Sequence, residues 1–180
     1  DFVGDTQVRL ACLLPAGPAG DRLIRVMPNT PSLAPPGPGA MKVERQGQAV
    51  TIANADYAVT HDPAKNAGLP SRILFPGTGK VFDTFQLNDR LHSKQEGVGG
   101  FRLSEDKTPE VNVVAAGPLY AEVQVKARYM QGAKAAPGQA RAVYTYSYFA
   151  GQPVVRVAAD ISQDEAFSWS ELHFLELYFK

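Results

Sequence analysis

A polar segment after a predicted strand carries side chains that could act on an acidic sugar. Residues 85–92 include Asn88, Asp89, Arg90 and His92. A guanidinium such as Arg90 can neutralise a carboxylate, and an imidazole such as His92 can remove a neighbouring proton near neutral pH. We expect the segment to form a loop at a sheet edge, with Asn88 and Asp89 contacting substrate. The structural alternative is an Asx-type turn with an Asp–Arg pair.

Three tyrosines with a spacing of two form the second candidate. Tyr144, Tyr146 and Tyr148 share one face of a predicted strand. Flat aromatic rings stack on the CH faces of sugars, and their hydroxyls can satisfy sugar hydroxyl groups. The alternative is cross-strand packing, in which the rings fill the space between layers. Trp169 is a further stacking candidate, with core packing as its alternative.

A third group lies near the end of the chain, where Glu171, His173 and Glu176 are close together. These residue types suit an acid–base pair, and they suit a metal site less well. On a regular strand Glu171 and His173 share a face, and Glu176 lies opposite. The alternative is a set of paired or rim-exposed charges. His61 precedes Asp62-Pro63 and is interpreted as a turn residue.

Other chemistries find no support in the sequence. The three histidines are widely spaced, so we expect no metal site and no other cofactor. The run Gly97-Val98-Gly99-Gly100 lacks the lysine and following helix of a phosphate-binding loop, and it is interpreted as a flexible turn. Gly-x-Ser-x-Gly is absent, which gives a serine hydrolase no support.

The elements that must position these residues are strands, because apolar residues alternate with a period of two. Residues 120–129, 141–149 and 154–161 are the clearest cases, and brief connections predict an antiparallel meander. In 120–129, Val123 and Val125 lie on the buried face. Weaker strands are predicted at 7–14, 21–27, 48–53, 56–61, 72–75, 81–86 and 111–116. The expected fold class is an all-β antiparallel sandwich with few or no helices.

Prolines divide the chain into two parts. The run Pro35-Pro36-Gly37-Pro38-Gly39 cannot form a helix or a central strand. We interpret residues 1–40 as the trailing strands of a preceding β-domain plus a Pro-rich linker, and residues 41–180 as the β-sandwich domain. Residues 169–180 are ambiguous between strand and helix, and the aromatic content favours a strand. Their apolar character suggests a chain that continues into a further domain.

Two stretches carry a family resemblance. Residues 52–75, IANADYAVTHDPAKNAGLPSRILF, have the shape of the opening hairpin of the galactose-mutarotase-like supersandwich. GPLYAEVQVKARY and VYTYSYFAGQPVVRVAADI, within residues 117–161, resemble the central β-sandwich of the exo-rhamnogalacturonan lyase-like family. The resemblance implies a supersandwich fold, a polysaccharide or oligosaccharide partner, and a C-terminal α/α-toroid domain that this chain does not contain.

Composition narrows the class of partner. The chain has 180 residues with 18 basic and 18 acidic side chains, and this balance argues against a nucleic-acid partner. No stretch has the length of a membrane span, so no membrane partner is expected. Secretion or a periplasmic location is expected if the parent protein degrades polysaccharide.

Three functions therefore stay open. The first is the β-sandwich portion of a polysaccharide lyase, or of a related enzyme acting on acidic, pectin-type polysaccharide, which would be inactive alone. The second is a non-catalytic carbohydrate-binding module. The third is a structural or interaction domain without a glycan site.

Overall fold

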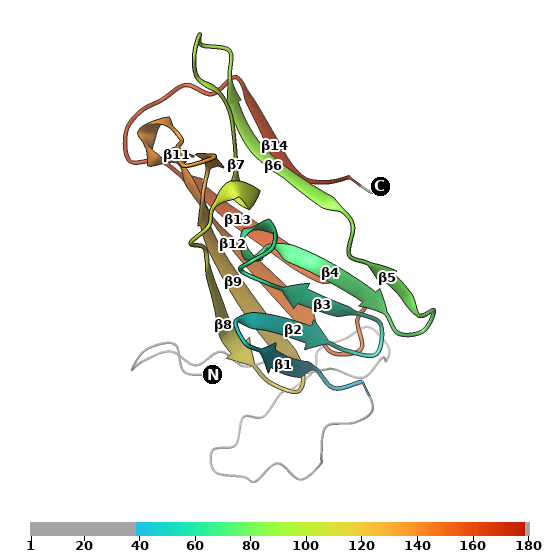
Figure 1. The fold of residues 1–180 in the computed structure, drawn as a ribbon. Coiled ribbons are helices and arrows are strands. Elements are labelled where there is room, and N and C mark those ends of the chain that lie inside the picture. The colour runs from blue at the N-terminus through green and yellow to red at the C-terminus, as the bar shows by residue number, and fades with distance from the viewer. Residues whose placement is uncertain (1–38, 179–180) are drawn as a thin grey trace, which may run out of the picture.

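The computed structural model describes residues 39–178, which fold into three antiparallel sheets (Figure 1). The predicted strands and linker within residues 1–38 lie outside the described part. The first strand begins at Lys42, and within residues 39–178 no helix is longer than three residues. No helix in this range is long and apolar enough to cross a membrane. The all-β sandwich class is confirmed.

The first sheet is a five-stranded meander in the order β1-β2-β3-β4-β5. Its strands are β1 (Lys42–Gln46), β2 (Ala49–Ala53), β3 (Ala58–His61), β4 (Pro70–Phe75) and β5 (Lys80–Phe82). A short 3-10 turn, η1 (Asn66–Gly68), lies between β3 and β4. This sheet contains the stretch that resembles the supersandwich hairpin.

The second sheet has the order β11-β10-β7-β6-β14 and contains the candidate site residues of the segments 85–92 and 171–176. Its strands are β6 (Gln86–Ser93), β7 (Gly99–Arg102), β10 (Met130–Gln131), β11 (Lys134–Ala135) and β14 (Glu171–Tyr178). The turn η2 (Leu103–Glu105) directly follows β7, and η3 (Pro137–Gln139) follows β11. The strand prediction for the C-terminal stretch is confirmed as β14, which forms one edge of the sheet.

The third sheet has the order β13-β12-β9-β8 and contains the three strands with the clearest alternation. Its strands are β8 (Glu110–Ala116), β9 (Tyr120–Arg128), β12 (Arg141–Phe149) and β13 (Val155–Ser162). The antiparallel order of β9, β12 and β13 confirms the predicted meander. Val123 and Val125 are fully buried, as the alternation predicts.

The tyrosine row of β12 joins the other two sheets across the core. Tyr148 packs against His61 of β3, with ring centroids 6.0 Å apart. Tyr144 stacks on Phe174 of β14 at 5.7 Å. One face of the four-stranded sheet is therefore covered by the first sheet near Tyr148 and by the second sheet near Tyr144. The sandwich thus has one layer of four strands and an opposing layer made of two sheets.

Candidate functional site

The segment that was predicted to be a polar loop is instead the strand β6, in the middle of a pairing with β7 and β14. Its alternation is complete: one face carries Asn88, Arg90 and His92, whereas the other face, which includes Asp89, is buried. The loop prediction was wrong because Asp89 occupies a position where an apolar residue would have indicated a strand.

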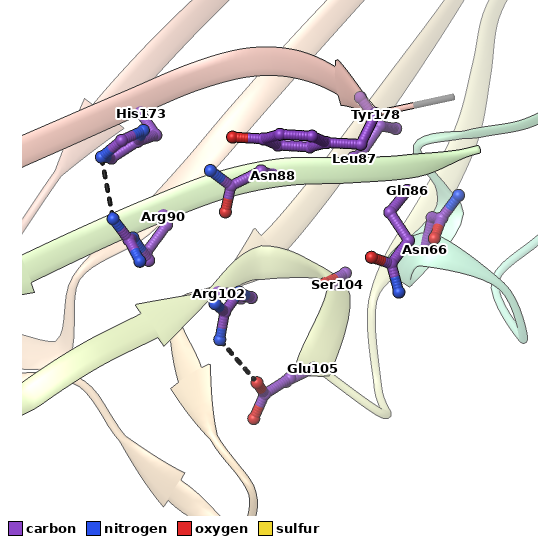
Figure 2. A pocket seen from close by; sticks show the side chains of 10 residues that line it. All are labelled: Asn66, Gln86, Leu87, Asn88, Arg90, Arg102, Ser104, Glu105, His173 and Tyr178. Atoms are coloured by element: carbon purple, nitrogen blue, oxygen red, sulfur yellow. Dashed lines mark hydrogen bonds and ion pairs between the residues drawn. The ribbon is translucent and has the colours of Figure 1, made fainter. Parts of the chain in front are cut away.

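A pocket of about 630 Å³ lies over the polar face of β6 (Figure 2). This volume is within the range of about 300–1,000 Å³ that is typical of small-molecule sites. The lining comes from η1, β6, β7, η2 and β14. It consists of Asn66, Gln86, Leu87, Asn88, Arg90, Arg102, Ser104, Glu105, His173 and Tyr178.

Arg90 and His173 are in contact at one end of this pocket, and Asn66 lies with Gln86 at the other end (Figure 2). The pairing of β6 with β14 places His173 directly opposite Arg90. Arg90 Nη2 lies 2.9 Å from His173 Nε2 and 3.4 Å from Glu171 Oε2. The sequence suggested each of these residues separately, and the strand pairing brings them together.

Glu176 joins the same cluster because β14 contains a β-bulge. The register shifts by one residue between His173 and Glu176, so that Glu176 pairs with Asn88 on the pocket side. His173 Nδ1 lies 3.0 Å from Glu176 Oε1. Asn88 Nδ2 donates to Glu176 Oε2 at 2.7 Å. The prediction that Glu176 faces away from His173 was therefore wrong, since regular alternation fails at the bulge.

The carboxylates around His173 favour its protonated form. The hydrogen bonds with Glu176 and then Glu171 raise the pKa of His173, although the nearby Arg90 opposes this effect. In turn, contacts with Asn88, His173 and Tyr178 lower the pKa of Glu176. His173 therefore combines an orienting carboxylate with a raised pKa, which suits transfer of a proton near neutral pH.

Replacing Glu176 should show which carboxylate governs His173. We expect the variant Glu176→Gln to lower the pKa of His173, because the amide keeps the shape but removes the negative charge. The pH dependence of the His173 ring signals in NMR spectra measures this change. Glu110→Gln is a matched control, since Glu110 pairs with Lys126 on another sheet. An unchanged pKa in Glu176→Gln would assign the effect to Glu171.

The remaining predicted site residues lie away from the pocket. Tyr144, Tyr146 and Tyr148 are at most 2% exposed, so the strand presents no open aromatic face to a sugar. Asp89 is 1% exposed and accepts hydrogen bonds from Tyr129 and Tyr144. The three tyrosines pack in the core, which is the alternative that the sequence left open. For Asp89 the alternative of an Asx-type turn with an arginine was wrong, because it lies in β6 and binds tyrosines.

His92 and Trp169 also do not line the pocket: His92 lies on β6, and Trp169 lies just before β14. His92 shares the face of Arg90 and pairs with Glu171, and it packs against Gly100 of β7. Trp169 precedes β14, where its ring is 4.7 Å from Phe167 and 6.0 Å from Phe101. Its indole N–H donates to Gln163 at 2.9 Å.

Sequence reasoning missed several residues that contribute to the pocket. Arg102 ends β7, which was interpreted as a turn because of Gly97, Gly99 and Gly100, and it lies 3.6 Å from Glu105. The alternation of buried Phe101 with outward Arg102 was the available signal. Asn66 had no comparable signal, since its place depends on the turn η1.

His61 is a core residue rather than a turn residue. It ends β3, is fully buried, and contacts Gly68 O through Nδ1 at 2.9 Å and Tyr148 Oη through Nε2 at 2.5 Å. Because a carbonyl can only accept, Nδ1 carries the proton and Nε2 accepts from the tyrosine hydroxyl. Burial lowers the pKa of His61 to about 4.

Comparison with known proteins assigns neither a family nor a function to this chain. No protein family, no curated protein and no solved structure matches this chain. Among residues 39–178, no group of three or more His, Cys, Asp or Glu side chains could hold a metal ion.

Proposed function

We propose that the pocket over β6 binds an acidic sugar of a pectin-type polysaccharide, within the β-sandwich portion of a polysaccharide lyase or a related glycan-active enzyme. The proposal rests on one observation. Two arginines, three side-chain amides and His173 line a single cavity of suitable size, and His173 is hydrogen-bonded to Glu176 behind it. The resemblance of residues 52–75 and 117–161 to the lyase-like family supports the same substrate class.

Each kind of side chain in the pocket matches a part of a uronate. The guanidinium of Arg102 can bind the carboxylate through paired, charge-assisted hydrogen bonds. The side-chain amides of Asn66, Gln86 and Asn88 can donate to and accept from sugar hydroxyls. The ring of Tyr178 is 52% exposed and can stack on a CH face of the sugar.

The cluster around His173 supports a chemical role beyond binding. A lyase removes the proton next to the uronate carboxylate, which requires a base together with a cation that stabilises the developing negative charge. In its neutral form His173 donates from Nδ1 to Glu176, and its Nε2 accepts from Arg90; Nε2 would act as the base once Arg90 turns to the substrate carboxylate. The toroid domain implied by the resemblance would complete the cleft, so we expect the 180-residue chain alone to bind sugar without cleaving it.

Calorimetry with matched oligosaccharides tests the proposal. The full chain should bind oligogalacturonate more tightly than neutral galacto-oligosaccharides of equal length. Arg102→Ala should weaken binding of the acidic ligand by about tenfold, since a charge-assisted hydrogen bond contributes about 1.5 kcal/mol. Arg45→Ala on β1 is the control, because Arg45 does not line the pocket.

Two results would contradict the proposal. The first is equal affinity for the acidic and neutral oligosaccharides. The second is binding that Arg102→Ala and Arg45→Ala leave equally unchanged. Formation of unsaturated uronate by the chain alone, followed by its ultraviolet absorbance, would overturn the expectation that the chain binds sugar without cleaving it.

A further inference from the structure

The bulge of β14 requires an unusual backbone conformation. Leu175 has a φ of +49°, in the left-handed region that non-glycine residues seldom adopt. Such a conformation is unfavourable by roughly 1–2 kcal/mol and persists where surrounding contacts hold it. Without the bulge, Glu176 would not share a face with His173 in the present register.

Asp89 is the β6 residue that lies opposite the bulge. It falls between Asn88, which pairs with Glu176, and Arg90, which pairs with His173. Its side chain enters the core on the far side of the sheet from the pocket. There the backbone N–H of Leu175 is near enough to favour the charged form of Asp89.

Two tyrosines hold the carboxylate of Asp89 in this position. Tyr129 Oη donates to Oδ1 at 2.8 Å, and Tyr144 Oη donates to Oδ2. Tyr144 also stacks on Phe174, the other residue that the bulge inserts between His173 and Glu176. Both residues of the bulge are therefore fixed from the core side, one through its backbone and the other through its ring.

We propose that Asp89 is a positioning residue for the pocket, which it does not touch: by binding the Leu175 N–H it keeps the bulge formed and Glu176 within hydrogen-bond distance of His173. The relevance of this geometry to a sugar rests on the proposed function, but the geometry itself does not. The charged groups around His173 are Glu171 and Glu176 on β14 and Arg90 on β6, with Arg102 and Glu105 lining the same pocket.

The pKa of His173 reports whether the bulge is intact. In the full chain, Asp89→Leu removes the acceptor at nearly the same side-chain size and should lower this pKa in the same direction as Glu176→Gln, as measured by NMR titration of the ring. The sequence has three histidines, so His173→Gln identifies the signal. Tyr144→Phe is the matched control. It removes a donor to Asp89 but leaves the link to Leu175, so the pKa of His173 should not change.

An unchanged His173 pKa in folded Asp89→Leu would overturn the proposal, as would an equal shift in Tyr144→Phe. Hydrogen exchange of the Leu175 amide in the wild type gives a second test that needs no variant. We expect slow exchange, and fast exchange would show that Asp89 does not hold the bulge. Both readouts work without ligand, so a failure of sugar binding cannot be mistaken for a failure of the positioning role.

Discussion

Acidification from about pH 7 to about pH 4 is expected to lower the free energy of unfolding by about 3 kcal/mol through His61 alone. The unfolded chain protonates this residue near 6.5, whereas the folded protein resists protonation down to about 4. Between these values the unfolded state binds more protons, so stability falls as the pH falls. Each unit of the pKa difference corresponds to about 1.4 kcal/mol.

The His61→Gln variant isolates this effect. A glutamine does not titrate, although it loses stability at neutral pH because Gly68 O and Tyr148 Oη lose their fitted partner. Urea unfolding of both proteins across this pH range gives the difference in their free energies of unfolding. That difference should shrink by about 3 kcal/mol on acidification. A constant difference would show that His61 does not titrate as its burial implies.

Comparing the two proteins also removes the contributions of other groups. Burial raises the pKa of Asp89, and Glu176 and Glu171 raise that of His173. A group whose pKa is higher in the folded than in the unfolded state stabilises the folded protein more as the pH falls. Asp89 and His173 therefore oppose the loss of stability that His61 causes on acidification. Because both are present in the wild type and in His61→Gln, they cancel in the difference.

Gly68→Ala should destabilise the protein by about 2–5 kcal/mol. Gly68 has a φ of +79°, which is unfavourable for alanine by about 1–2 kcal/mol. The added Cβ would also overlap Val111 Cγ2 and lie 3.4 Å from Val125 Cγ1. Such overpacking of a core adds about 1–3 kcal/mol. Thermal or urea unfolding measures the total.

Gly79→Ala is the matched control for the backbone part of this effect. Gly79 has a φ of +66°, but a Cβ there would meet nothing within 4 Å. We therefore expect a loss of only about 1 kcal/mol at Gly79. Equal losses at the two positions would mean that β8 and β9 move enough to accommodate the new methyl group. Since η1 also carries Asn66, Gly68→Ala should additionally weaken sugar binding at the pocket.

The strands that the sequence predicted well are those in which burial follows a simple local pattern. In β9, Val123 and Val125 alternate with polar residues, and the strand was found with its correct buried face. In β6 the same pattern exists, but Asp89 stands on the buried face. Its partners, Tyr129 and Tyr144, are 40 and 55 residues away. A local pattern contains no information about such partners, so a central strand was taken for a loop.

The candidate site shows the same division between local and distant information. The chemistry of Arg90 and His173 was visible in their residue types, but their contact depends on the pairing of β6 with β14. The bulge that turns Glu176 toward the pocket depends on Leu175, whose residue type gives no sign of a left-handed conformation. His61 was misplaced because its partner Tyr148 lies 87 residues further along the chain.

Trp169 provides an intrinsic fluorescence reporter next to the start of β14. It is the only tryptophan in the sequence, so selective excitation observes this one site. Its half-buried indole packs against Phe101 of β7 and Phe167. Trp169 immediately precedes Ser170, whose N–H donates to His92 O at 2.9 Å. Detachment of β14 from its neighbours would expose the indole to water and shift its emission to longer wavelength. Fluorescence can therefore follow the docking of the strand that carries His173 and Glu176, separately from the unfolding of the whole sandwich.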